Sequence, residues 1–162
     1  MTLKVVLNLF FIILFSVGIC KSQDLTFNKS VFYTVLESGN KNDIDFQLSI
    51  IHSLIIPEVN AYEGVLLMKK AGVVVKVNEK LSLFKSGRAK LESSILKDNN
   101  NIEYHFLRLI IQENAPPFLR YREEINSDAI KIQTNFKSLS PIMQKVIFNY
   151  CKKSSILKIP QP

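Results

Sequence analysis

The sequence is poor in the residues that carry metal and covalent chemistry. Its 162 residues include only two cysteines and two histidines. Cys20 falls in an N-terminal apolar segment, so only Cys151 belongs clearly to the main domain, and an internal disulfide is excluded. His52 and His105 fall on different expected helices, and neither has a second histidine or cysteine at metal-ligand spacing. We expect no metal site, no cofactor and a domain stabilised by packing alone.

Motifs of common catalytic sites are also missing. Five glycines form no glycine-rich phosphate loop, and Gly-x-Ser-x-Gly does not occur. Cys151 follows Tyr150 on an apolar helix face, where a small core residue is expected rather than a nucleophile. His105 and Glu103 are two residues apart and therefore point to different sides of a helix, and we expect His105 at the surface or half-buried. The sequence provides no catalytic residue and favours a protein that is not an enzyme.

Basic residues outnumber acidic ones by 21 to 14, which gives a net charge of +7. Removal of Lys4 and Lys21 with an N-terminal signal leaves 19 basic residues against 14 acidic ones, a charge of +5. The basic residues are scattered rather than packed into one tract, which is typical of a solvated surface. We expect no nucleic-acid partner. For an exported chain, acidic envelope partners or anionic lipid head groups are better candidates.

The N-terminus has the pattern of a secretory signal peptide. Lys4 is followed by an apolar run over residues 5–17, broken only by Asn8 and Ser16, and small or polar residues come after it. The run is short for a transmembrane helix, which needs about 20 residues. We expect residues 1–22 to export the chain to the periplasm or beyond, with cleavage after Ser22 or Cys20.

Two alternatives for the N-terminus stay open. Residues 17–20 read Val-Gly-Ile-Cys and resemble a bacterial lipobox, in which a lipidated Cys20 becomes the mature N-terminus. The other alternative is that the apolar run is not cleaved and anchors the chain in the membrane. In either case we expect membrane contact only through this segment.

Apolar spacing and capping residues predict about seven helices and no sheet. The expected helices fall within residues 25–38, 42–56, 57–72, 78–97, 101–115, 118–136 and 140–153. Short loops between them favour antiparallel packing of successive helices. We therefore expect an all-α domain of six to seven helices over residues 23–153, followed by a flexible tail at residues 154–162.

Spacing also assigns particular positions to the core. Ile44, Leu48, Ile51 and Ile55 form one stripe, and Leu81 begins the stripe of the helix within residues 78–97. Small residues around Gly87 should let a neighbouring helix come close. The β-branched run over residues 73–77 favours extended structure, but no other segment offers a strand to pair with it. We expect a buried connection there.

The expected fold is organised around residues 99–121. Asn101 caps a helix that is apolar almost all round, and Pro116 and the following proline end it. A helix with apolar residues on more than one face has to lie between other helices. After the prolines, Phe118, Arg120 and Tyr121 surround a turn. Such a turn suits partner recognition, and it equally suits a turn pinned to the core by Phe118.

Residues 87–100 resemble the second helix and closing turn of a tetratricopeptide repeat. In that repeat, small and bulky residues alternate in a fixed order before an Asp-Pro-Asn turn. The same order is present here in Gly87, Leu91, Ser94 and Ile95, and Asp-Asn-Asn follows at residues 98–100. The match covers about half a repeat, and no second copy follows at the repeat length. The resemblance implies a compact, TPR-like array of helical hairpins.

The central stretch resembles a family of small exported helical proteins of Bacteroidota. The likeness is carried by Asn-Asn-x-Ile-Glu at 99–103, Phe-Leu-Arg-Leu at 106–109, Gln-Glu-Asn-Ala-Pro at 112–116 and Phe-Leu at 118–119. It extends over about residues 42–138. The resemblance implies an envelope location and a helical fold. It carries over no activity and no catalytic residue.

Arg108 is the unexpected charge in the central helix, since its neighbours from Phe106 to Ile111 are apolar. One interpretation is a cation that lines a groove and, with Arg120 and Tyr121, binds an anionic ligand. The other is a partly buried arginine paired with a carboxylate of a neighbouring helix. We expect a non-enzymatic scaffold or interaction protein of the bacterial cell envelope that binds an envelope protein. The alternative is a small-ligand carrier or enzyme with a site formed by Arg108, His105, Tyr104 and Glu103.

Overall fold

The computed structural model describes residues 27–159, which form seven α-helices, two short 3₁₀ helices and no strand. This confirms the all-α fold class. The expected signal peptide and Cys20 lie outside the described residues. Within residues 27–159, no helix has both the length and the apolar character that a membrane crossing requires. The elements in chain order are α2 (Lys29–Ser38), α3 (Lys41–His52), α4 (Val59–Val73), α5 (Val77–Lys97), α6 (Ile102–Asn114), η1 (Pro117–Leu119), α7 (Ile125–Asn135), η2 (Phe136–Ser138) and α8 (Pro141–Cys151).

Side-chain caps determine where several helices begin. Asn101 and Ser140 each accept a hydrogen bond from a backbone N–H in the first turn of α6 and α8, as the sequence predicts. α3 begins earlier than expected because Asn40 is its cap and accepts from two backbone N–H groups. Directly before it, Gly39 ends α2 with a φ of 65°, a left-handed conformation that glycine adopts without steric cost.

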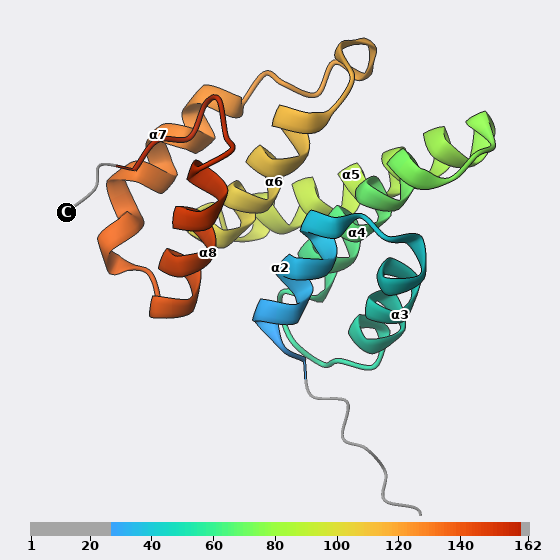
Figure 1. The fold of residues 1–162 in the computed structure, drawn as a ribbon, viewed down its shortest axis with the longest axis horizontal. Helices are drawn as coiled ribbons and strands as arrows, with labels where there is room; N and C mark the ends of the chain where they lie inside the picture. The colour runs from blue at the N-terminus through green and yellow to red at the C-terminus, as the bar shows by residue number, and fades with distance from the viewer. Residues whose placement is uncertain (1–26, 160–162) are drawn as a thin grey trace, which may run out of the picture.

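α4 and α5 form a helical hairpin whose backbones approach closely at Gly64 and Gly87 (Figure 1). A Cβ built on Gly64 would lie 2.6 Å from the carbonyl oxygen of Gly87, a distance that would force the backbone to shift. Only residues without a side chain allow this spacing. The expectation that small residues around Gly87 admit a close neighbour is confirmed.

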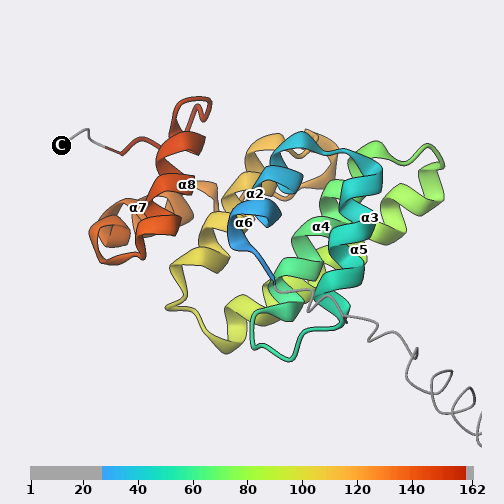
Figure 2. The ribbon, with the colours of Figure 1, turned by 60° about the horizontal axis from the view of Figure 1, so that its bottom comes forward.

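α6 lies at the centre of the fold. Every side chain from Glu103 to Gln112 is buried, and the helix contacts α4, α5 and α7. Figure 2 shows α6 between the pair formed by α7 and α8 and the group formed by α2 to α5. The central position inferred from apolar residues on several faces is confirmed.

Some positions assigned to the core by spacing are exposed. Ile55 is fully exposed because α3 ends at His52, so the stripe does not extend that far. In the connection between α4 and α5, Val74 is buried but Val75 and Val77 are exposed, and Leu81 is exposed in the first turns of α5. The expectation of a buried connection is wrong because this end of the hairpin projects past α3, and none of the helices within residues 27–159 covers it (Figures 1 and 2).

The chain after α8 packs onto the domain, in contrast to the flexible tail expected there. Leu157 is completely buried. The Glu113 carboxylate at the end of α6 accepts hydrogen bonds from the Ser154 hydroxyl at 2.8 Å and from the backbone N–H of Ser155 at 2.5 Å. Burial alone would raise the pKa of Glu113, but these hydrogen bonds and one from Tyr150 hold the pKa below its ordinary value. The half-buried carboxylate of Glu113 thus holds the segment after α8 against the domain.

Candidate functional site

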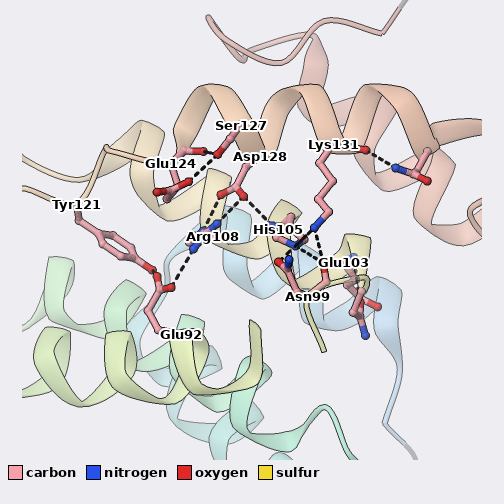
Figure 3. Close-up of polar contacts among 12 residues, drawn as sticks. Glu92, Asn99, Glu103, His105, Arg108, Tyr121, Glu124, Ser127, Asp128 and Lys131 are labelled. Carbon is pink, nitrogen blue, oxygen red and sulfur yellow. Dashed lines mark hydrogen bonds and ion pairs between the residues drawn. The ribbon is translucent and has the colours of Figure 1, made fainter. Parts of the chain in front are cut away.

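Arg108 is buried in the middle of α6 and is paired with carboxylates on both sides (Figure 3). Its Nε and Nη2 each donate to the carboxylate of Asp128 on α7 at 2.7 Å. Its Nη1 donates to Glu92 on α5 at 2.9 Å. Two parallel hydrogen bonds to one carboxylate are the strong geometry for arginine. The structure therefore shows the second interpretation of Arg108, a buried cation paired between helices.

The charges of this network stabilise one another. Burial alone would lower the pKa of Arg108, but the hydrogen bonds and negative charges of Asp128 and Glu92 raise it. Burial alone would raise the pKa of Asp128, yet hydrogen bonds from Arg108 and His105 hold it below its ordinary value. Both groups therefore stay charged at neutral pH, and Arg108 has little capacity left for a ligand.

His105 belongs to the same network, which corrects the expectation of a surface or half-buried residue. It is 3% exposed, and its Nδ1 lies 2.7 Å from an oxygen of Asp128. Its Nε2 lies 2.9 Å from the carbonyl oxygen of Asn99 and 3.1 Å from the ammonium of Lys131. His105 lies one turn before Arg108 on α6, so both side chains reach the same buried carboxylate, that of Asp128 on α7 (Figure 3).

Glu103 points to the other side of α6, as its spacing from His105 predicts. It accepts hydrogen bonds from the hydroxyls of Tyr33 on α2 and Tyr62 on α4, each at 3.0 Å, and pairs with the ammonium of Lys29 at 2.7 Å. Glu103 therefore does not converge with His105 and Arg108. Two separate polar networks on opposite sides of α6 replace the single site of the alternative hypothesis.

Arg108, Arg120 and Tyr121 line one groove between α5, α6 and the turn after η1. We call it the Arg108 groove, and its volume is about 620 Å³. Tyr121 is buried in its wall, where its hydroxyl donates to Glu92 at 2.5 Å and its ring lies 4.7 Å from the Arg88 guanidinium. Arg120 is exposed and has a left-handed φ of 47°. Phe118 is 75% exposed, so Tyr121 and not Phe118 pins this turn to the core.

Gln112 is the unusual polar residue of the Arg108 groove. Its side chain is 1% exposed, and its Oε1 has no hydrogen-bond partner among residues 27–159. A buried carbonyl without a donor costs free energy, and nearly all such groups in proteins are satisfied. The lining of the groove therefore contains one unpaired buried acceptor, Gln112, together with two exposed cations, Arg88 and Arg120.

A second groove lies between α2 and α8, with α6 residues at its floor. Figure 1 shows where these three helices lie in the fold. We call it the α2–α8 groove, and its volume is about 510 Å³. Its lining comes from α2, α4, α6 and α8, which are alternate helices of the chain. Phe106 and Ile110 form the floor, and Leu36, Ile142 and Val146 add apolar surface at the walls.

Three lysines surround the α2–α8 groove. Lys153 pairs with Glu37 across it at 2.6 Å, while Lys69 and Lys145 form no ion pair with any residue between 27 and 159. Lys69 is half-buried. Its burial lowers its pKa, and the positive charge of the nearby Lys153 lowers it further. The lining of the groove contains three ammonium groups and one carboxylate, that of Glu37. The groove is therefore apolar at its floor and positively charged at its edge.

Neither metal chemistry nor similarity assigns a function to these sites. Among residues 27–159, no three side chains of His, Cys, Asp or Glu gather as a metal ion would require. Comparisons with protein-family models, with curated proteins and with solved structures find no match for this chain.

Sequence reasoning missed Asp128 and the α2–α8 groove. A signal for Asp128 is present, because it lies three residues after Ile125 and four before Ile132, on the apolar face of α7. A carboxylate at a core-facing position requires a buried partner. No comparable signal exists for the groove, because its lysines come from α4, from α8 and from the residues just after α8, whose relative placement is a tertiary property.

Proposed function

We propose that this protein is a non-enzymatic helical interaction protein of the bacterial cell envelope. In this proposal the α2–α8 groove receives an acidic amphipathic helix of an envelope protein. The observation that carries it is the combination of an apolar floor with an excess of lysine at the edge of one concave surface. An amphipathic helix that lays its apolar face into such a groove is a common mode of peptide recognition.

The composition of the groove supports a protein segment as the occupant. Apolar side chains spaced one turn apart on a bound helix can pack on Phe106 and Ile110, which are themselves one turn apart on α6. Acidic residues on the flanks of that helix would then face Lys69 and Lys145. Opposite charges at the edge of an interface direct association and orientation more than they add affinity.

Site-specific photo-crosslinking in intact cells tests this function. A photoreactive residue at Ile142, which is half-exposed on the groove wall, should give a discrete crosslinked partner in the envelope fraction. The matched control places the same residue at Ile130, which is 62% exposed on α7 and lines neither groove. Crosslinking at Ile142 that does not exceed the Ile130 background would overturn the proposal.

Charge reversal adds a second arm to this experiment. Lys145→Glu should abolish most of the crosslink at Ile142, because it places a carboxylate where an acidic partner has to approach. Lys137→Glu changes the net charge equally at an exposed position outside both grooves and should leave the crosslink intact. Equal crosslinking in the two variants would show that the groove does not select an acidic partner.

The proposed envelope location has its own test. The intact mass of the protein purified from its bacterial host distinguishes a chain that begins at Gln23 from one that begins at a lipidated Cys20. A full-length chain retained in the cytoplasm would contradict export.

A small-ligand carrier is the second candidate, and the unpartnered Oε1 of Gln112 favours it. A ligand with a hydrogen-bond donor would satisfy this acceptor at the floor of the Arg108 groove. Native mass spectrometry of the purified protein should then show a bound small molecule that is lost in Gln112→Leu and kept in Gln133→Leu, whose site is exposed on α7. Identical spectra for the three proteins would exclude this candidate.

A further inference from the structure

The end of the α4–α5 hairpin exposes a cluster of aliphatic side chains. Val73, Val75, Val77 and Leu81 are 40%, 88%, 68% and 40% exposed. They fall within nine consecutive residues, and we call residues 73–81 the hairpin tip. Single exposed aliphatic residues are common on soluble proteins, but neighbouring ones mark a surface that contacts something else. Neither groove includes any of these four residues.

The shape of the hairpin tip limits what can cover it. In both ribbon views the green turn between α4 and α5 lies at the far end of the fold and projects beyond α3 (Figures 1 and 2). The tip is therefore convex. A protein partner would need a matching concave pocket to cover its apolar side chains. A fluid, deformable surface is the natural complement of a projecting apolar tip.

The charge of the hairpin tip indicates the sign of that surface. Lys76 lies between Val75 and Val77, and Lys80 follows in the first turn of α5, against Glu79 as the one acidic residue of the tip. Lysine stems can pack along apolar surface while their ammonium groups remain at a polar boundary. Valines flanked by lysines thus match a boundary between hydrocarbon and anionic head groups.

We propose that the hairpin tip docks on the surface of an anionic lipid bilayer. Val75 and Val77 enter the head-group region from the connection, while Lys76 and Lys80 contact lipid phosphates. No helix among residues 27–159 spans the bilayer in this arrangement, and the contact is peripheral. Association of two tips would also bury the valines, but it would bring the lysines of both copies together, so the bilayer is favoured over a second copy.

Co-sedimentation with lipid vesicles tests the proposal with the protein purified as its host delivers it. We expect binding to vesicles of phosphatidylethanolamine and phosphatidylglycerol that weakens as salt is raised, and weaker binding to phosphatidylcholine vesicles. Val75→Asp should reduce the affinity for anionic vesicles by at least about tenfold, because it removes apolar contact and adds a like charge. Lys76→Glu should reduce it by about tenfold or more, since each lysine near such a surface contributes about fivefold.

Matched variants separate this contact from general surface effects. Ile130→Asp and Lys137→Glu make the same changes at exposed positions away from the tip and should bind vesicles as the unchanged protein does. Lys145→Glu, which tests the α2–α8 groove, should also leave vesicle binding intact, so the two proposals can fail separately. Equal vesicle binding by Val75→Asp and the unchanged protein would overturn the inference. So would a dimer in sedimentation velocity that Val75→Asp dissociates while vesicle binding is absent.

Discussion

Replacing Arg108 with alanine should destabilise the fold because it leaves a buried carboxylate without its main partner. Asp128 is 1% exposed and accepts two hydrogen bonds from Arg108, both at 2.7 Å. After the substitution, only the contact with His105 remains. Glu92 is affected less, because its side chain is 30% exposed and keeps the hydrogen bond from Tyr121.

The size of the effect follows from the cost of an unpaired buried charge. Removing one partner of a buried ion pair typically costs about 3–5 kcal/mol. For a domain of this length, 1 kcal/mol corresponds to roughly 3–4 °C in Tm, so Arg108→Ala should lower Tm by about 10–20 °C. Circular dichroism at 222 nm during heating measures this directly, because the described fold is helical. Asp128→Ala should give a loss of similar size, and the double variant should lose less than the two single losses together.

The matched control is Arg122→Ala. Arg122 is exposed, and the one described hydrogen bond of its side chain is a 3.4 Å contact with the backbone carbonyl of Glu113, so the Tm of this variant should change by less than about 2 °C. An Arg108→Ala variant that melts within 2 °C of the unchanged protein would refute the argument that this arginine is structural. It would then favour a role for Arg108 in binding a ligand.

Three further predictions concern packing and titration. Gly64→Ala should destabilise the fold by about 2–4 kcal/mol in urea denaturation, because the new Cβ would collide with the backbone of α5. Gly72→Ala is the control and should be neutral or stabilising, because a Cβ there meets no neighbouring atom within 4 Å. Equal effects of the two substitutions would disprove the close approach of the two helices. Asp128 and Glu113 have lower pKa values in the folded protein than their ordinary values of 3.8 and 4.5. Their contribution to stability is therefore complete above these ordinary values and is lost as the pH falls through the lower pKa values of the folded state. A Tm that stays constant from pH 5 to pH 2.5 would contradict this. Leu157→Ala should cost about 2–4 kcal/mol in the same denaturation, and no measurable loss would show that the segment after α8 is frayed.

Local sequence features were sufficient to predict the helices and their order. Asn101 and Ser140 are caps with a known preference, and Pro116 ends α6 at the expected place. The apolar neighbours of Arg108 were enough to state its two alternatives, a cation that lines a ligand groove or a buried arginine paired with a carboxylate. Spacing along one helix could not choose between them, because Asp128 lies 20 residues away on α7.

The incorrect expectations share a physical cause. Periodicity reports which side chains lie on one face of a helix, and it does not report whether another helix covers that face. Leu81 and Val77 continue an apolar pattern into the end of a hairpin that projects from the fold. In the opposite direction, His105 and the segment around Leu157 are buried because the distant carboxylates Asp128 and Glu113 hold them. Long-range polar partners are not visible in a local pattern.

The polar residues of α6 fix the helices that surround it. Glu103 is hydrogen-bonded to α2 and α4, Arg108 to α5 and α7, and Glu113 to α8 through the Tyr150 hydroxyl at 2.9 Å. Each helix packed around α6 is therefore fixed to α6 by a directional contact, whereas apolar packing alone is non-directional. The ion pair between Lys153 and Glu37 crosses the groove, but both side chains are exposed, so it contributes little to the free energy of folding. α2 and α8 also pack directly against each other, so the two walls are held in place both by their attachment to α6 and by this contact.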